Sequence, residues 1–63
     1  MVKVIYHKRE WEVEAGITVR QAMERVGLDP RQVLAVRHGK LIADDALLEE
    51  GDEITLVSII SGG

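Results

Sequence analysis

The chain ends in two glycines, Gly62 and Gly63, and the second carries the group with the clearest chemical use. Glycine has no Cβ, so a terminal glycine pair can adopt almost any backbone conformation and enter a narrow channel. The carboxylate of Gly63 is then a group that this protein can deliver into the active site of another enzyme. Chain ends are also often frayed, and two glycines can be the remnant of a linker. The rest of the sequence has to decide between these interpretations.

The other polar side chains offer little catalytic chemistry. The two histidines, His7 and His38, lie far apart in the sequence, and no cysteine or Ser-His-acid pattern accompanies them. Asp44 and Asp45 are neighbours in a polar segment, so they are not expected to face one substrate as an acid/base pair. We therefore expect no catalytic residue, no metal site and no cofactor bound by the chain itself.

Length and composition indicate one small domain. The chain has 63 residues, 46% of them hydrophobic, and no cysteine, so its core must come from aliphatic packing without disulfides. No segment resembles a signal peptide or a membrane span. We expect a cytoplasmic protein that makes no contact with a membrane.

The net charge of −3 is distributed unevenly along the chain. Residues 41–63 contain no basic side chain, and their acidic side chains are Asp44, Asp45, Glu49, Glu50, Asp52 and Glu53. This pattern argues against direct nucleic-acid binding, which favours a basic stripe with aromatic platforms. The acidic run is interpreted either as a solvated loop or as a surface that steers the chain end toward a basic partner.

The first half of the chain predicts a hairpin followed by a helix. Residues 2–7 and 11–15 alternate with period 2, as two paired strands would, and residues 8–10 form a polar turn. Thr18 and Gln21 have the spacing of a capping box, which begins a helix over residues 19–26. An apolar stripe follows at helical spacing and consists of Val19, Ala22, Met23 and Val26. Gly27 is then suited to the C-cap.

The second half predicts two further strands, over residues 33–37 and 54–59, with a short segment at 41–42 and a tight turn at 47–52. The resulting order is ββαββ, with residues 1–59 as the domain and 60–63 as a flexible tail. The helix stripe is expected to pack against one face of the sheet, on Val4, Leu34 or Val36, Ile54 and Leu56.

These features together resemble the ubiquitin-like β-grasp sulfur carriers. The family includes thiamine-thiazole carriers (ThiS), the small subunit of molybdopterin synthase (MoaD) and the carriers for 2-thiouridine formation in tRNA. The resemblance rests on Leu48-x-x-Gly51-Asp52, the last strand and the terminal glycines. Residues 58–63 and 35–37 most resemble the tRNA-thiolation carriers, whereas Arg37-His38-Gly39 departs from the thiazole-pathway pattern. The fold class it implies is α+β, with a mixed sheet and one main helix on one face.

The resemblance also implies a function for the chain end. An E1-like enzyme that binds ATP and Mg²⁺ would adenylate Gly63, and a persulfide sulfurtransferase would supply sulfur to give a thiocarboxylate. A sulfur-acceptor enzyme would then use it, while Ser61 and Gly62 would give the tail its flexibility. The chain would be a carrier rather than an enzyme. Two alternatives stay open, namely a ubiquitin-like modifier joined to lysines through Gly63 and a plain β-grasp interaction module.

A partner-binding patch is expected on the last strand. If Ile54 and Leu56 face the helix, alternation sends Val57 and Ile59 to the outer face of the sheet. An exposed apolar pair is typical of a partner site, and Arg37 is expected to border it. The alternatives are a strand covered on both faces, or ordinary scattered surface residues.

Overall fold

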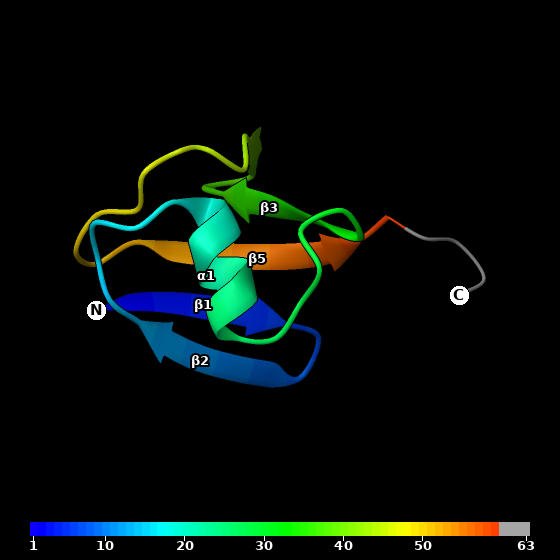
Figure 1. The fold of residues 1–63 in the computed structure, drawn as a ribbon, viewed down its shortest axis with the longest axis horizontal. Coiled ribbons are helices and arrows are strands. Elements are labelled where there is room, and N and C mark those ends of the chain that lie inside the picture. The colour runs from blue at the N-terminus through cyan, green and yellow to red at the C-terminus, as the bar shows by residue number, and fades with distance from the viewer. Residues whose placement is uncertain (60–63) are drawn as a thin grey trace.

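The computed structural model describes residues 1–59, and residues 60–63 lie outside the described residues. A single sheet is covered on one face by a single helix (Figure 1). The elements are β1 (Val2–Tyr6), β2 (Arg9–Val13), α1 (Val19–Arg25), β3 (Val33–Arg37), β4 (Lys40–Ile42) and β5 (Glu53–Ser58). The strand order is β2-β1-β5-β3-β4. Because β1 and β5 are parallel and the other pairs antiparallel, the sheet is mixed, as predicted.

The predicted pairing of the first two strands is confirmed by the β1–β2 hairpin, but the turn lies earlier in the chain than predicted. Tyr6 is paired with Arg9, so the turn consists of His7 and Lys8. Residues 9 and 10, which were expected in a polar turn, therefore belong to β2. The physical reason is that His7 adopts a φ of 55°, in the left-handed region, which allows the chain to reverse within two residues.

Both ends of α1 are fixed by local hydrogen bonds. The capping box is present, because Thr18 Oγ1 accepts from the Gln21 N–H and Gln21 Oε1 accepts from the Thr18 N–H. At the other end Gly27 has a φ of 83°, and its N–H donates to the Glu24 carbonyl. The Leu28 N–H donates to the Met23 carbonyl, which completes a Schellman ending. The helix ends at Arg25, one residue before the predicted end, and Val26 is its C-cap.

The core lies between α1 and the sheet and is entirely apolar. Its buried members are Val2, Val4, Val13, Ile17, Val19, Ala22, Met23, Val33, Ala35, Leu48, Ile54 and Leu56. Three of the four predicted helix positions are among them, while Val26 is only half-buried and packs at the edge.

The prediction for β3 is wrong about which face is buried. Leu34 or Val36 was expected under the helix, but Val33 and Ala35 are buried there, and Leu34 is 40% exposed. Apolar residues at 33, 34, 35 and 36 give no alternation from which the faces could be assigned. The fold selects Val33 and Ala35 because Ala35 pairs with the buried Leu56 of β5.

The segment expected at 41–42 forms β4, which pairs with β3 at the edge of the sheet. The order is therefore ββαββ with this short strand inserted before β5. β5 lies in the middle of the sheet between β1 and β3. Among residues 1–59, no helix is long and apolar enough to cross a membrane.

Candidate functional site

The chain leaves the domain from the end of β5, its central strand. β5 runs parallel to β1 and therefore ends at the side of the sheet where the β1–β2 turn lies (Figure 1). Ile59 follows β5, and its N–H donates to the Gln32 carbonyl at 3.0 Å. The backbone is thus anchored up to Ile59. The predicted site residues Ser61, Gly62 and Gly63 lie outside the described residues.

The outer face of β5 carries an exposed apolar surface. Val57 is 39% exposed and Ile59 is 49% exposed, whereas Ile54 and Leu56 are buried on the helix side. The predicted exposure of Val57 and Ile59 is therefore confirmed, and their role in partner binding stays a prediction. The third member is Leu34, which is paired with Val57 across the β3–β5 ladder. We call Leu34, Val57 and Ile59 the outer apolar patch.

Leu34 was missed from the sequence because its strand had been assigned the wrong face. Leu34 could have been identified from its position opposite Val57 in the pairing of β3 with β5. In an antiparallel pair, residues directly opposite each other point to the same face of the sheet. Once Val57 is placed outside, its partner Leu34 must be outside too, and the two side chains extend one apolar surface across both strands.

Arg37 does not border the outer apolar patch. It lies at the other end of β3, on the same side of the strand as the buried Val33 and Ala35. Its Nη1 donates to Asp52 Oδ2 at 2.9 Å, and both side chains are largely buried, with 28% and 18% exposed. The structure thus gives Arg37 a structural contact in place of the expected position beside the patch.

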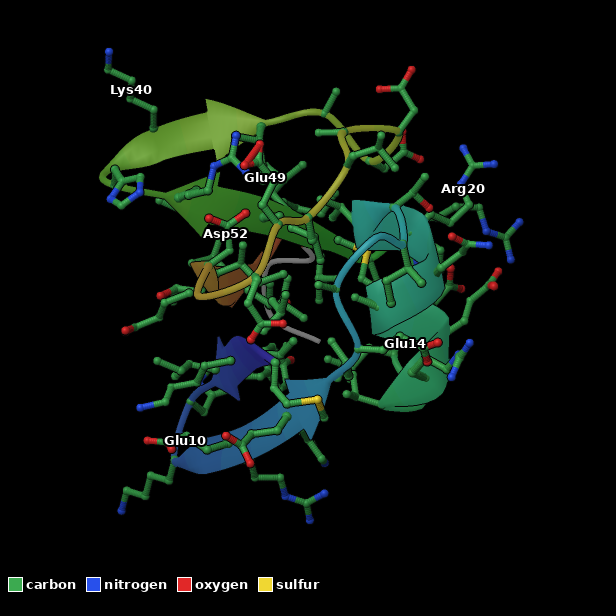
Figure 2. All side chains as sticks on the ribbon, turned by 90° about the vertical axis from the view of Figure 1, so that its left-hand side faces the viewer. Glu10, Glu14, Arg20, Lys40, Glu49 and Asp52 are labelled. Carbon is green, nitrogen blue, oxygen red and sulfur yellow. The ribbon has the colours of Figure 1, made fainter. Side chains whose placement is uncertain are left out.

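The Leu48-x-x-Gly51-Asp52 turn fixes the start of β5. Leu48 is buried in the core at 1% exposure, and Gly51 has a φ of 88°. Asp52 Oδ2 accepts the Glu49 N–H at 2.8 Å, and Figure 2 shows both residues on the loop at this end of the sheet. This backbone hydrogen bond, together with that from Arg37, holds the pKa of Asp52 below its usual value.

The acidic run is divided between two places. Glu49, Glu50, Asp52 and Glu53 lie at the start of β5, whereas Asp44 lies beside α1 and lines a hollow together with Leu34 of the outer apolar patch. Several of its carboxylates are already engaged. Asp44 accepts from Arg20 at 2.6 Å, Asp52 accepts from Arg37, and Glu50 pairs with the N-terminal amino group. Three of the six acidic side chains are therefore paired within the fold, and the steering of the chain end toward a basic partner stays a prediction.

The sequence is similar to known carrier proteins over most of its length. The model of the ThiS family matches residues 2–63. The sulfur carrier protein TtuB from Thermus thermophilus is 36% identical over 56 residues, which cover 89% of this chain and 86% of TtuB.

Solved structures agree on the fold. SAMP1 from Haloferax volcanii superposes with a TM-score of 0.66 at 20% identity, over 98% of both chains. A ubiquitin-like protein from Caldiarchaeum subterraneum gives a TM-score of 0.53 at 19% identity, over 97% of both chains. At these identities the likeness concerns the β-grasp architecture alone.

Proposed function

The chain belongs to the ThiS family of sulfur carriers, and we propose that Gly63 is the residue on which it carries sulfur. The observation that carries this proposal is the extent of the family match, which runs through the terminal glycines to residue 63. As a member of this family the chain is a carrier rather than a catalyst. Its chemistry is therefore performed by the enzymes that receive its end.

The proposed cycle begins with activation, because a carboxylate is a poor electrophile. An E1-like enzyme with ATP and Mg²⁺ joins the Gly63 carboxylate to AMP and releases pyrophosphate. A thiol reductant attacks the persulfide of the sulfurtransferase, forms a disulfide with its cysteine and releases the outer sulfur as hydrosulfide, which attacks the acyl carbon. The new C–S bond replaces the C–O bond to AMP, which leaves, and Gly63 becomes a thiocarboxylate. Its nucleophilic sulfur is then transferred to an activated carbon held by the acceptor enzyme.

In the proposed cycle, residues 1–59 form the folded domain, and residues 60–63 carry the Gly63 carboxylate into the active site of the partner enzyme. Hydrogen bonding anchors the backbone up to Ile59, so the reach of the chain end is set by four further residues. Fully extended, four residues span at most about 14 Å. That length suits insertion of Gly63 into a narrow channel while the domain stays outside it.

The outer apolar patch is the proposed docking surface for the activating and acceptor enzymes. Val57 lies on β5, Leu34 lies opposite it on the adjacent β3, and Ile59 follows the end of β5, where the chain end begins. A partner that covers Val57 and Leu34 would therefore hold the base of residues 60–63 at its own channel. Apolar exposure of this kind is typical of interaction sites.

The proposed acceptor pathway is 2-thiouridine formation in tRNA, supported by the resemblance of residues 58–63 and 35–37 to those carriers. Thiazole formation for thiamine and molybdopterin synthesis are the other two acceptor chemistries of this kind of carrier. Incubation of the thiocarboxylate form with each acceptor enzyme would distinguish them. We expect turnover with the tRNA-thiolating enzyme, and turnover only with another acceptor would contradict the assignment.

Intact-mass spectrometry tests carriage itself. The chain is incubated with its E1-like enzyme, ATP, Mg²⁺ and a sulfur source, with a reaction lacking ATP as the control. We expect replacement of one oxygen by one sulfur, located at Gly63 by fragmentation. Ladders on other proteins would support the ubiquitin-like alternative, and an unchanged mass would overturn both.

A further inference from the structure

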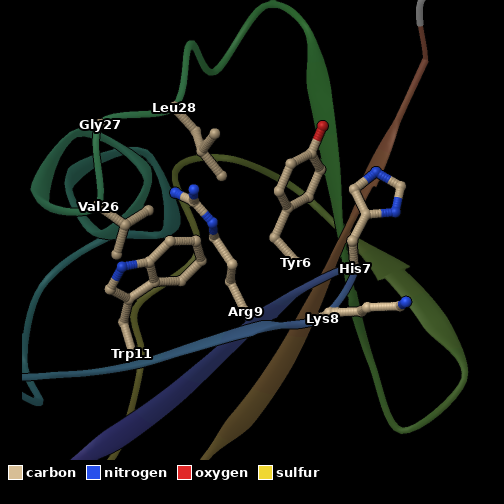
Figure 3. Close-up of a pocket in the computed structure, with 8 residues that line it drawn as sticks. All are labelled: Tyr6, His7, Lys8, Arg9, Trp11, Val26, Gly27 and Leu28. Atoms are coloured by element: carbon tan, nitrogen blue, oxygen red, sulfur yellow. The ribbon is translucent and has the colours of Figure 1, made fainter.

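A groove lies on the helix side of the sheet, between the β1–β2 hairpin and the C-terminal end of α1. Figure 3 shows it, and its volume is about 510 Å³. Tyr6 and Trp11 rise from the two hairpin strands, and Val26 and Leu28 face them from the end of the helix. Because the outer apolar patch is on the opposite face of the sheet, this groove is a separate surface.

The only tyrosine and the only tryptophan of the chain both line the groove. The sequence has one Tyr, one Trp and no Phe, and both Tyr6 and Trp11 are only half-buried here. Val26 and Leu28 are likewise half-buried against the core. Partly exposed aromatic and aliphatic side chains that line a hollow are typical of the buried centre of an interface.

One wall of the groove is an open sheet edge. β2 pairs with β1 alone and lies at the end of the strand order, so alternate N–H and C=O groups along it point away from the sheet. The other edge strand, β4, has three residues, whereas β2 has five. β2 is therefore the edge long enough to pair with an added strand. A peptide that pairs in this way places alternate side chains toward the groove.

The open end of the groove is basic. Lys8 and Arg9 are exposed, and neither forms an ion pair within residues 1–59. Figure 3 shows Arg9 rising between Trp11 and Tyr6. At the other end Glu14 pairs with Arg25 of α1. Glu10 and Glu12 alternate onto the outer face of β2, where Glu10 is within 4.0 Å of Lys3 and Glu12 is opposite Lys3 in the ladder. On the helix side, the charge that faces an occupant of the groove is therefore positive.

We propose that this groove binds an extended acidic peptide segment of a partner protein. The segment adds a strand to β2, its apolar side chains contact Trp11, Val26 and Leu28, and its carboxylates pair with Lys8 and Arg9. This interaction uses neither the chain end nor the outer apolar patch, so it goes beyond the proposed sulfur carriage. It gives the carrier a second docking surface, which a partner can occupy while Gly63 is in use.

Trp11 provides a direct readout, because it is the only tryptophan of the chain. The probe is a short acetylated peptide of alternating valine and isoleucine flanked by glutamates, titrated into the intact protein while tryptophan fluorescence is recorded. We expect a saturable change that weakens with added salt, as charge pairing requires. Backbone amide shifts in NMR spectra are expected along residues 9–13 and not along 40–42.

The charge requirement is tested with matched variants. Arg9→Glu should weaken peptide binding by about tenfold or more, because it turns an attractive pair into a repulsive one. Lys40→Glu changes the same charge on the far edge strand and should leave the affinity unchanged. Thermal melts of both variants verify folding, and Lys8→Glu is the substitute if Arg9→Glu fails to fold.

The strand requirement is tested with two altered peptides. Replacing the central valine by proline removes a backbone donor and should abolish binding, and replacing the glutamates by lysines should weaken it strongly. Equal affinity for the lysine peptide, no saturable binding of the acidic peptide, or tighter binding of single-stranded RNA would each overturn the proposal.

Discussion

Asp52 connects three segments of the chain that are distant in sequence. Its side chain accepts hydrogen bonds from the Glu49 N–H and from Arg37 of β3, and its carbonyl accepts from the Lys3 N–H of β1 at 2.9 Å. One residue thus fixes the turn before β5 and sets the position of the strand between its two neighbours. The sequence singled out Asp52 as part of the Leu48-x-x-Gly51-Asp52 motif, but it gave no sign of the ion pair with Arg37.

The first prediction concerns the pH dependence of this residue. The folded state holds the pKa of Asp52 below its ordinary value of about 3.9, mainly through the Glu49 N–H and then through Arg37. Its stabilising contribution is therefore complete above that ordinary value and is lost as the pH falls through the lower folded pKa. Asp52→Asn should lower stability near neutral pH, and its deficit relative to the unmodified protein should shrink as the pH falls below about 4.

Urea unfolding followed by circular dichroism at a series of pH values measures this difference. Asp45→Asn is the control, since Asp45 is exposed and forms no ion pair within residues 1–59. A deficit for Asp52→Asn that stays constant down to pH 2 would show that the carboxylate charge is not what stabilises the turn.

The second prediction concerns Val57 in the outer apolar patch. Val57→Glu should leave the domain folded, because the side chain is already 39% exposed. It should weaken binding to the activating enzyme by about tenfold or more, because an unpaired carboxylate would be buried at the contact. Leu47→Glu is the matched control, because Leu47 is 62% exposed on a loop and pairs in a bridge with Thr18, away from the patch.

Calorimetric titration with the E1-like enzyme, with a thermal melt of each variant, gives the comparison. If Val57→Glu and Leu47→Glu bind the enzyme equally well, the outer apolar patch is not the docking surface. Unfolding of Val57→Glu alone would show that this residue belongs to the core.

At the scale of elements, α1 depends on the rest of the fold. Its seven residues are too few to form a stable helix alone. The N–H groups of Val19 and Arg20 donate to the carbonyls of Ala46 and Asp44, so the loop before β5 completes the cap begun by Thr18. The helix and this loop therefore stabilise each other, and both cover the same core.

The third prediction compares two truncations at the interface of helix and sheet. Leu56→Ala removes a side chain that is 2% exposed and should cost about 2–4 kcal/mol of unfolding free energy. Val26→Ala should cost clearly less, because Val26 is half-buried at the rim of the groove. Urea denaturation measures both values. A larger cost at Val26 than at Leu56 would contradict the observed packing.

The elements were predictable where the sequence contains a local physical signal. Thr18, Gln21 and Gly27 mark both helix ends, and alternation marks the strands, so their order was confirmed. The buried face of β3 was not predictable, because four consecutive apolar residues carry no period. The groove could not be foreseen either, since Trp11 and Leu28 are distant in sequence and line one groove only in the folded chain.

At the scale of the whole molecule, the two ends and the two sheet faces differ in charge and polarity. The end where β5 begins holds four acidic residues, of which Asp52 pairs with Arg37 and Glu50 with the N-terminal amino group. The opposite end holds the exit of the chain, next to the basic β1–β2 turn. One sheet face carries the outer apolar patch, and the helix side carries the groove. If both docking proposals hold, a partner in the groove would leave the outer apolar patch free for the enzyme that uses Gly63.

The central claim is that the carboxylate of Gly63 must be free and able to enter an adenylation site. ATP–pyrophosphate exchange with the cognate E1-like enzyme tests it most directly, comparing the unmodified chain with one extended by a single alanine after Gly63. A thermal melt of both chains verifies folding, which the extension should not change, since chain ends contribute little to a core. We predict exchange with the unmodified chain and none with the extended one. Full exchange with the extended chain would contradict the account, because the glycine end would then be unnecessary for activation.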